Sequence, residues 1–298
     1  MFRAMASGAS VQHVSDTARW VAFYRAMESE RPDAVFRDPY ARRLAGPEGE
    51  AIVNAMPKGR QFAWPMVVRT AVMDEIILRM VQREHADLVL NLAAGLDARP
   101  YRLPLPPNLR WIDADLPAMI DYKSGHLAGE RPACRVEFAK VDLTDQATRQ
   151  SLFEYAGAEA RRALVISEGL LVYLTPEQVG ALAEDLHRQL TFQWWLFDLG
   201  SPRLLRMLER TWGPALRAGN APLIFAPAEG TAFFEKHGWH EKEFHSVMDE
   251  SIRLNRTFPL ARFWRWVSRF YPKRIRQEFA RMSGIVLLER SSEGPRTG

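Results

Sequence analysis

The sequence has very little cysteine and no long hydrophobic run. Its only cysteine among 298 residues, Cys134, excludes an internal disulfide and gives no sign of an oxidising compartment. No stretch approaches the ~20 consecutive apolar residues that a membrane-spanning helix requires, and the first residues, MFRAMASGASVQHVSD, lack the apolar core of a secretory signal. We therefore expect a cytoplasmic protein without a membrane partner.

The sequence also lacks a strong excess of charge. Its 40 lysines and arginines are nearly balanced by 36 aspartates and glutamates. Basic and aromatic residues interleave in one stretch, 262–276, as they do in a platform for single-stranded nucleic acid. A packed helix whose arginines extend outward gives the same pattern. We therefore do not expect a nucleic-acid partner, and nucleic-acid binding is kept as an alternative.

The sequence does contain enough apolar material for a large core. Hydrophobic residues make up 47% of the chain, and short apolar runs alternate with segments of helical period. This alternation predicts an α/β fold in which helices cover both faces of a mostly parallel sheet. A helix is expected over 67–84, and seven strands are expected over 88–92, 110–112, 136–141, 164–167, 194–199, 243–247 and 284–289.

The strongest functional signal lies where the first two predicted strands end. The apolar run 88–92 leads into a turn of small residues that includes Ala93 and Gly95, and the second strand leads into Asp113 and Asp115. Small residues let the backbone of this turn approach a ligand, and an acid ending the second strand accepts hydrogen bonds from ribose hydroxyls. The pattern predicts a nucleotide-type cofactor with Asp115, or alternatively Asp113, on its ribose.

The spacing alone leaves two cofactors open. The G-x-G-x-x-G fingerprint of dinucleotide binders is incomplete, because Ala93 stands where its first glycine is usual. S-adenosylmethionine has a ribose but no phosphate groups, so it fits such a turn at least as well. A nicotinamide-dependent oxidoreductase is the alternative at this point.

Several motifs in order resemble the S-adenosylmethionine-dependent leucine carboxyl methyltransferase family, which includes bacterial polyketide carboxyl O-methyltransferases. They are TARWVAFYRAMESERPDAVFRDPYARRLAG (17–46), Arg69-Thr70, NLAAGLDARPYRL (91–103), DADLP (113–117), VDL (141–143) and SEGLLVYLTPEQV (167–179). The chain departs from the family at Ala93, where many relatives have Gly, and at Asp113, where Glu is more frequent. The resemblance implies a class I methyltransferase-like Rossmann sheet and S-adenosylmethionine as the cofactor.

The resemblance also implies roles for individual residues. Arg69 would hold the carboxylate of the cofactor, and Glu168 would lie by its amino end. Asp142 and Leu143 would frame the adenine, although Asp142 also reads as a helix N-cap. Glu168 follows an apolar predicted strand, so it is expected to be partly buried with a cation beside it.

The N-terminal segment of this family folds over the crevice. On that basis we expect four side chains to face the acceptor: Arg19, Tyr24, Arg25 and Tyr173. The motifs are spread over most of the chain, so they suggest one domain, 1–298, in four parts. These are an N-terminal helical cap (1–65), a cofactor-binding core (66–200), a lid insertion (201–228) with breaks at 212–214 and 226–227, and C-terminal strands with a helix (229–298).

Whether the reaction needs a general base depends on the ionisation of the acceptor. A carboxylate is already ionised at neutral pH, so an in-line displacement on it needs positioning but no general base. We therefore expect a small-molecule carboxylate, such as a polyketide or another secondary metabolite. A phenol or alcohol would need a base such as His13, His126 or His187. A protein C-terminus, the acceptor in the eukaryotic branch of the family, would need a partner protein.

Three other patterns are expected to be structural. Thr175 and Gln178 have the spacing of a helix capping box, and Gly238 has the position of a helix C-cap. Three histidines between 237 and 245 are spaced like metal ligands, but no cysteine or well-placed acid completes a set. No metal site is expected, and the sequence gives no oligomeric state.

Overall fold

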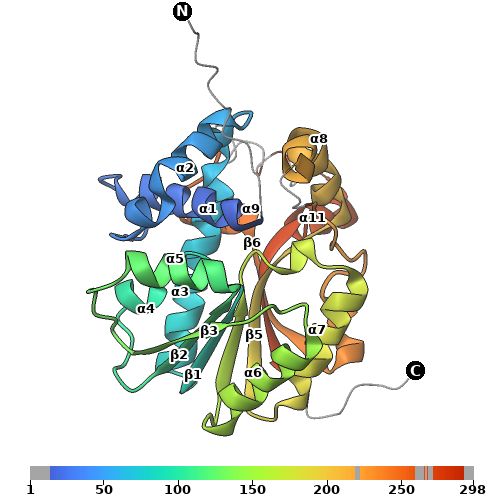
Figure 1. Cartoon of the computed structure of the whole chain (residues 1–298). Coiled ribbons are helices and arrows are strands. Elements are labelled where there is room, and N and C mark those ends of the chain that lie inside the picture. The colour runs from blue at the N-terminus through green and yellow to red at the C-terminus, as the bar shows by residue number, and fades with distance from the viewer. Residues whose placement is uncertain (1–13, 219–221, 259–264, 266, 268–270, 292–298) are drawn as a thin grey trace, which may run out of the picture.

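Seven strands form a single sheet in the order β3-β2-β1-β4-β5-β7-β6 (Figure 1). The computed structural model describes residues 14–218, 222–258, 265, 267 and 271–291. Strand β7 runs antiparallel to both of its neighbours, and the pairs from β3 to β5 are all parallel. The strands are β1 (Leu88–Leu92), β2 (Arg110–Asp115), β3 (Arg135–Lys140), β4 (Ala163–Ser167), β5 (Phe192–Gly200), β6 (Trp239–Ser246) and β7 (Ser283–Arg290).

The seven predicted strands are all present, and their ends differ from the prediction by a few residues. The largest difference is in β6, which begins at Trp239 instead of residue 243. The helices are α1 (Val14–Ser29), α2 (Ala41–Ala55), η1 (Gly59–Phe62), α3 (Ala63–Gln82), α4 (Arg99–Arg102), α5 (Pro117–His126), α6 (Gln146–Ala158), η2 (Leu171–Tyr173), α7 (Pro176–Arg188), α8 (Pro202–Ala218), η3 (Gly230–His237), α9 (Val247–Arg253) and α11 (Lys273–Ala280).

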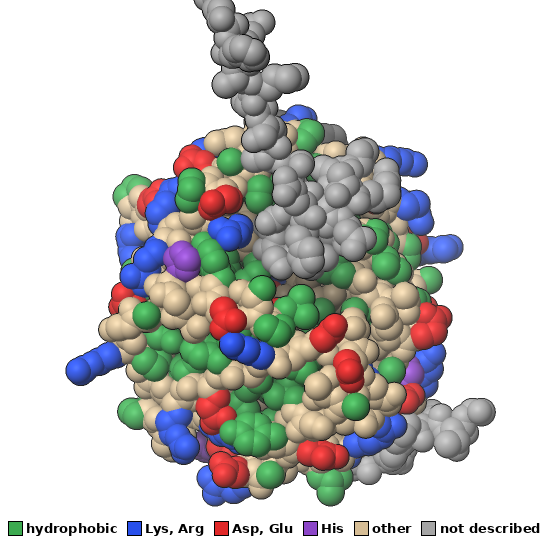
Figure 2. Space-filling view, viewed as in Figure 1, with side chains coloured by type: hydrophobic (Ala, Val, Ile, Leu, Met, Phe, Trp, Pro, Cys, Tyr) green, Lys and Arg blue, Asp and Glu red, His purple; other side chains and the backbone are tan. Residues whose placement is uncertain are grey.

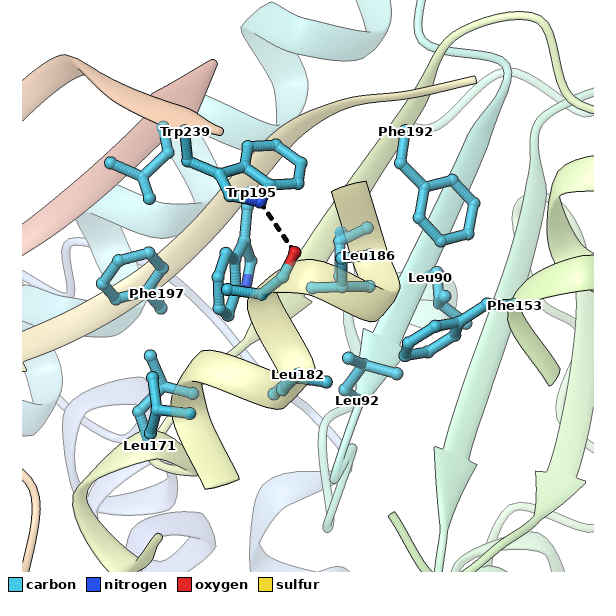
Figure 3. Close-up of a cluster of buried hydrophobic side chains, with 14 of the residues drawn as sticks. Leu90, Leu92, Phe153, Leu171, Leu182, Leu186, Phe192, Trp195, Phe197 and Trp239 are labelled. Atoms are coloured by element: carbon cyan, nitrogen blue, oxygen red, sulfur yellow. Dashed lines mark hydrogen bonds between the residues drawn. The ribbon is translucent and has the colours of Figure 1, made fainter. Parts of the chain in front are cut away.

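Helices cover both faces of the sheet, as the alternation of elements predicts. Successive side chains of a strand point to opposite faces. Leu90 and Leu92 of β1 pack among residues of α6 and α7, and Val89 packs among residues of α3. Figure 3 shows the first of these clusters, in which Trp195 of β5 lies near both Phe197 and Trp239. The sheet is therefore buried on both sides, as in other parallel sheets.

Local signals in the sequence fix several helix ends. Helix α3 begins at Ala63, four residues before the predicted start, and it ends at Gln82. The capping box at Thr175 is confirmed, because its hydroxyl accepts from the Gln178 amide and the Gln178 side chain accepts from the Thr175 amide. Gly238 ends η3 with a φ of 85°, a left-handed conformation that suits glycine.

The N-terminal helices form a cap on the end of the sheet where the cofactor turn lies. Phe23 of α1 and Leu44 of α2 belong to a third apolar cluster, together with Leu96 from the turn after β1. In Figure 1 the cap (blue) and α8 both lie at the upper end of the molecule, above the sheet. No helix within the described ranges is long and apolar enough to cross a membrane.

Helix α8 begins the predicted lid, and it is longer than expected. We predicted a break at 212–214, but the helix continues to Ala218. Trp212 packs its ring against Trp20 of the cap at 6.3 Å and against Phe62 at 5.0 Å. This tertiary packing holds the helix through the Gly213-Pro214 step, which local propensity alone disfavours. The predicted break at 226–227 lies in a segment without helix.

Candidate active site

A cavity of about 610 Å³ lies beyond the carboxyl ends of β1, β2, β4 and β5. This is where open α/β sheets bind their ligands, and the volume is typical of small-molecule sites. The strand ends supply one side of the cavity and carry most of its charged groups. Residues of the cap, α8 and the C-terminal segment supply the other side, which is mostly apolar.

The turn after β1 brings its backbone to the cavity. Ala93 and Gly95 both adopt left-handed backbone conformations, with φ of 51° and 48°. The Gly95 amide donates to Asp115 Oδ2 at 2.7 Å, and the Leu116 amide donates to the other carboxylate oxygen at 2.7 Å. A Cβ at residue 95 would lie 3.3 Å from the Ala18 Cβ. A side chain at residue 95 would therefore crowd the cap where it approaches the turn, and glycine avoids this close contact.

Asp115 lines the cavity, whereas Asp113 does not. Asp113 lies two residues deeper in β2 and is fully buried. Its carboxylate accepts from Lys123 Nζ at 2.6 Å, from Trp111 at 2.9 Å and from Asn91 at 3.0 Å. The alternative of Asp113 as the ribose acceptor is therefore not supported, because its oxygens are enclosed in the core.

Glu168 follows β4 and lies between two arginines. Its Oε2 is 2.7 Å from Arg99 Nη1, and its Oε1 is 2.9 Å from Arg69 Nε. Burial alone would raise the pKa of Glu168, but Arg99 and Arg69 outweigh burial and hold it below its usual value. The expected cation beside this buried acid is confirmed, and there are two.

Arg69 of α3 bridges two acids at the strand ends. Besides Glu168, it contacts Asp198 of β5, with its Nη1 3.1 Å from Oδ2. Burial opposes the charge of Arg69, yet Asp198 and Glu168 raise its pKa further. Gly169 has a φ of 67°, and a Cβ there would lie 3.2 Å from Arg69 Nη1. The glycine thus leaves room for the guanidinium, and its amide donates to Asp198 Oδ1 at 2.6 Å.

Three residues of this site were not predicted. Asp198 follows the apolar run of β5 in the same way that Asp115 and Glu168 end their strands, so the same rule finds it. Asp97 and Arg99 lie within the quoted NLAAGLDARPYRL motif. Arg99 is almost fully buried, and its guanidinium reaches Asp97 at 2.8 Å as well as Glu168. Their pairing depends on the fold of the turn, which the sequence does not show.

Asp142 and Leu143 lie outside the main cavity. Asp142 is exposed, and its Oδ1 accepts from the Thr144 amide at 2.9 Å and from the Thr144 hydroxyl at 2.7 Å. Its alternative role as a helix N-cap is wrong, because Asp145 caps α6. Leu143 lines a second cavity of about 260 Å³ that shares Leu170 with the first. The two residues are therefore adjacent to the site but not part of its surface.

Three of the four expected acceptor-facing residues line the cavity: Tyr24, Arg25 and Tyr173. The Tyr24 hydroxyl donates to the Gly59 carbonyl at 2.8 Å, and burial raises the pKa of Tyr24 to about 12. Arg25 contacts Asp38 at 2.9 Å. Arg19 instead lies on another face of α1, where it contacts Glu48 at 3.2 Å, so the structure does not place it at the cavity.

The histidines considered as bases lie elsewhere. His126 stacks on Tyr122 with ring centroids 4.0 Å apart, and His187 packs against Trp239. His13 lies outside the described residues, as do residues 262–264, 266 and 268–270 of the basic stretch 262–276. Among the described residues that line the cavity, none is a histidine, lysine or cysteine. Within the same described ranges, no group of three His, Cys, Asp or Glu is placed to hold a metal ion.

Comparisons with known proteins agree with this geometry. A protein of Streptomyces coelicolor, named as an S-adenosyl-L-methionine-dependent methyltransferase, is 29% identical over 255 residues that cover 80% of this chain and 87% of the relative. One of Parafrankia with the same kind of name is 34% identical over 269 residues, which cover 83% of each chain.

Solved structures share the fold at low identity. A DUF574 family protein of Streptomyces avermitilis superposes with a TM-score of 0.57 at 13% identity, covering 92% of this chain and 97% of its own. A methyltransferase structure from Thermobifida fusca gives a TM-score of 0.54 at 12% identity, covering 96% and 97%. The class I methyltransferase-like sheet is thereby confirmed.

The family model of leucine carboxyl methyltransferases matches residues 18–187, more than half of the chain. This match and the two relatives rule out the nicotinamide-dependent oxidoreductase as the alternative. The chain belongs to the leucine carboxyl methyltransferase family and is an S-adenosylmethionine-dependent methyltransferase.

Proposed function

We propose that this methyltransferase acts on a carboxylate of a small molecule, such as a polyketide or another secondary metabolite, in the cytoplasm. The observation that supports the carboxylate is the chemistry of the described cavity lining, which contains no histidine, lysine or cysteine to act as a general base. We propose that the protein acts without a nucleic-acid partner and without a membrane partner.

The charged half of the cavity fits S-adenosylmethionine. Arg69 would hold the carboxylate of its amino-acid end through the guanidinium fork, and Glu168 with Asp198 would hold its ammonium. Asp115 would accept from the ribose hydroxyls beside the turn of Ala93 and Gly95. When bound, this cofactor supplies a methyl group activated by its positively charged sulfur.

Four carboxylates and two arginines line the described cavity: Asp97, Asp115, Glu168, Asp198, Arg25 and Arg69. The acids therefore outnumber the bases, which suits a cofactor with a net positive charge. With Arg69 and the turn fixing the cofactor, the chain contributes orientation, exclusion of water and neutralisation of charge. These effects supply the rate when no proton has to be removed.

Most titratable groups at the cavity are poorly suited to remove a proton at neutral pH. Burial raises the pKa of Asp115, but both of its carboxylate oxygens already accept from backbone amides, of Gly95 and Leu116. Arginines hold the pKa values of Glu168 and Asp97 below their usual range, against the effect of burial. Burial raises the pKa of Tyr24 to about 12 and also raises that of Tyr173. A phenol or alcohol would therefore remain protonated, whereas a carboxylate is ready to react.

Calorimetric titration with S-adenosylmethionine and S-adenosylhomocysteine tests the cofactor assignments. We expect Arg69→Ala and Asp115→Ala each to weaken binding by about tenfold or more, which is roughly 1.4 kcal/mol. Glu154→Ala is the control, because Glu154 is an exposed acid of α6 that does not line the cavity. Unchanged binding in both site variants would contradict the assignments.

The kind of acceptor is tested by the stability of the product. The protein is incubated with methyl-labelled S-adenosylmethionine and either decanoic acid or decanol. A methyl ester releases labelled methanol in mild base, whereas a methyl ether does not. Base-labile label with the acid supports the proposal. Base-stable label with the alcohol, and none with the acid, would overturn it.

A further inference from the structure

The half of the cavity that faces away from the strand ends is apolar and rich in aromatic rings. Its lining includes Trp20 and Phe62 from the cap side, Leu208 and Trp212 from α8, and Met248 from α9. We call this half the apolar compartment. The proposed function assigns the charged groups at the strand ends to S-adenosylmethionine. The apolar compartment is therefore the part of the cavity that remains for the acceptor.

The compartment has a roof in which the lid is attached to the cap. The Trp212 ring lies 6.3 Å from that of Trp20 and 5.0 Å from that of Phe62, and its Nε1 donates to the Pro57 carbonyl at 3.4 Å. In Figure 1 the cap helices and α8 stand on opposite sides of the upper end of the molecule. Trp212 thus spans the two and shields the space beneath from water.

Three polar side chains near the compartment already have partners within the protein, whereas the buried Trp20 Nε1 has none among the described residues and offers a single donor. The Tyr24 hydroxyl donates to Gly59, Arg25 pairs with Asp38, and Tyr173 is hydrogen-bonded to Thr17. A peptide carries an amide N–H and a carbonyl at nearly every residue, and each needs a partner when it is buried. A sugar has the same requirement for its hydroxyls. The compartment therefore suits neither a peptide nor a sugar.

The edge of the compartment is apolar as well. Met207 of α8 and Phe279 of α11 line the cavity, yet 45% of Met207 and 38% of Phe279 remain exposed to solvent. The Arg203 guanidinium lies 4.6 Å from the centre of the Phe279 ring, so the two helices meet there. An apolar chain would pass from water into the compartment between these side chains, and a flexible methionine adapts to chains of different shape.

We propose that the apolar compartment binds the body of the acceptor, and that the acceptor is a monocarboxylic acid with a long or bulky hydrocarbon body. This inference rests on the proposed carboxyl methyl transfer for the position of the reacting group. The apolar lining itself supports the hydrocarbon body. The energy of binding then comes from burial of that body, and the carboxylate would lie where the compartment borders the charged half, close to the methyl group of the cofactor.

Calorimetric titration of the full chain with hexanoic, octanoic and decanoic acid tests the proposal, in the presence of saturating S-adenosylhomocysteine and below micellar concentrations. Each added methylene is expected to tighten binding about fourfold, which corresponds to the ~0.8 kcal/mol of a buried CH₂. Succinic acid, which carries a second charge in place of an apolar tail, is expected not to bind.

A matched pair of variants on α8 places the same ring inside or outside the compartment. Leu208→Trp fills space at a cavity-lining position, whereas Arg206→Trp puts the ring on the exposed face of the same helix. We expect Leu208→Trp to weaken the binding of decanoic acid at least tenfold and to leave the binding of S-adenosylhomocysteine unchanged. Arg206→Trp should leave both unchanged.

The outcomes separate this inference from the proposed function. Affinity independent of chain length, or equal binding of succinic acid, would overturn the apolar acceptor while S-adenosylhomocysteine binding still supports the methyltransferase. An equal loss of affinity for decanoic acid in both tryptophan variants would also overturn the apolar acceptor. Chain-length dependence with base-stable methyl products would keep the compartment and overturn the carboxyl acceptor. Tight binding of a peptide with a C-terminal leucine, with no binding of decanoic acid, would favour a protein acceptor instead.

Discussion

The two halves of the cavity are organised in opposite ways. At the strand ends, buried charges meet in a chain, in which Arg99 contacts Asp74, Asp97 and Glu168 within 2.7–2.8 Å. In the apolar compartment, rings of the cap and the lid pack on one another, and Trp212 is their centre. The first half depends on each charge having its partner, and its geometry is fixed by directional bonds. The second depends on apolar area, and it tolerates changes of shape.

Removing one member of the charged chain is expected to have the largest effect. Arg99→Met leaves Asp97 buried without its paired cation and removes one of the two arginines that contact Asp74 and Glu168. Breaking a buried pair in this way typically costs about 3–5 kcal/mol in the free energy of unfolding. Urea denaturation measures this change. The control is Arg42→Met, because Arg42 pairs with Glu30 at the surface and should cost at most about 1 kcal/mol. Equal losses in the two variants would remove the contrast between buried and exposed ion pairs.

Truncating the ring at the centre of the apolar compartment is expected to have the next largest effect. Trp212→Ala removes two aromatic contacts worth about 0.5–1.5 kcal/mol each, so we expect the free energy of unfolding to fall by about 1–3 kcal/mol. Hydrogen exchange should also become faster in α8. Thr211→Ala changes the exposed neighbour on the same helix and should leave both measurements nearly unchanged. Protection of α8 that survives the loss of Trp212 would show that the roof is held by other contacts.

The charged half should also respond to acid in a defined direction. The folded-state pKa of Glu168 is lowered, so its stabilising effect is fully present above its ordinary value of 4.5 and is lost as the pH falls through the folded value. The gap in unfolding free energy between the wild type and Glu168→Gln should therefore shrink as the pH falls from 6 to below 4. A gap that stays constant with pH would show that the ion pairs of Glu168 add no stability.

The smallest expected effect concerns the backbone of the turn. Ala93 has a φ of 51°, and the left-handed conformation costs about 1–2 kcal/mol for a residue with a Cβ. Ala93→Gly relieves this strain and loses about 0.5–1 kcal/mol in chain entropy, so a net gain of about 0.5–1 kcal/mol is expected. Ala94→Gly, at a neighbour without positive φ, should instead destabilise the protein. A loss of stability in both variants would show that the strain at Ala93 is relieved by its surroundings.

The fold was predictable because its signals are local and repeated. Strands β1, β4, β5 and β7 contain short apolar runs bounded by polar or turn residues, and they are buried between the two helical layers. The edge strands β3 and β6 are more polar and more exposed. The extent of α8 was not predictable, because Gly213-Pro214 is a breaking signal and the opposing force is the packing of Trp212 on the cap. Such packing joins residues far apart in the sequence.

The site was predictable where one rule covers it. Asp115 and Glu168 each end a strand of the parallel sheet, and the fold brings such ends together. Asp198 obeys the same rule, but the apolar residues on both sides of it make it appear as part of the strand itself. Asp142 also follows a strand, yet its carboxylate turns back onto Thr144. The position of an acid after a parallel strand therefore predicts the edge of the sheet at which the acid lies. Local hydrogen bonding then decides whether that acid faces the cavity.

The pairing of Arg69 with Glu168 and Asp198 has a consequence for turnover. The guanidinium has two carboxylate partners in the protein without a ligand. Under the proposed assignment of Arg69, a bound cofactor would exchange one set of ion pairs for another and gain only the difference. The spent cofactor would give up the same difference on leaving, so we expect moderate inhibition by the product and rapid exchange of used cofactor for fresh.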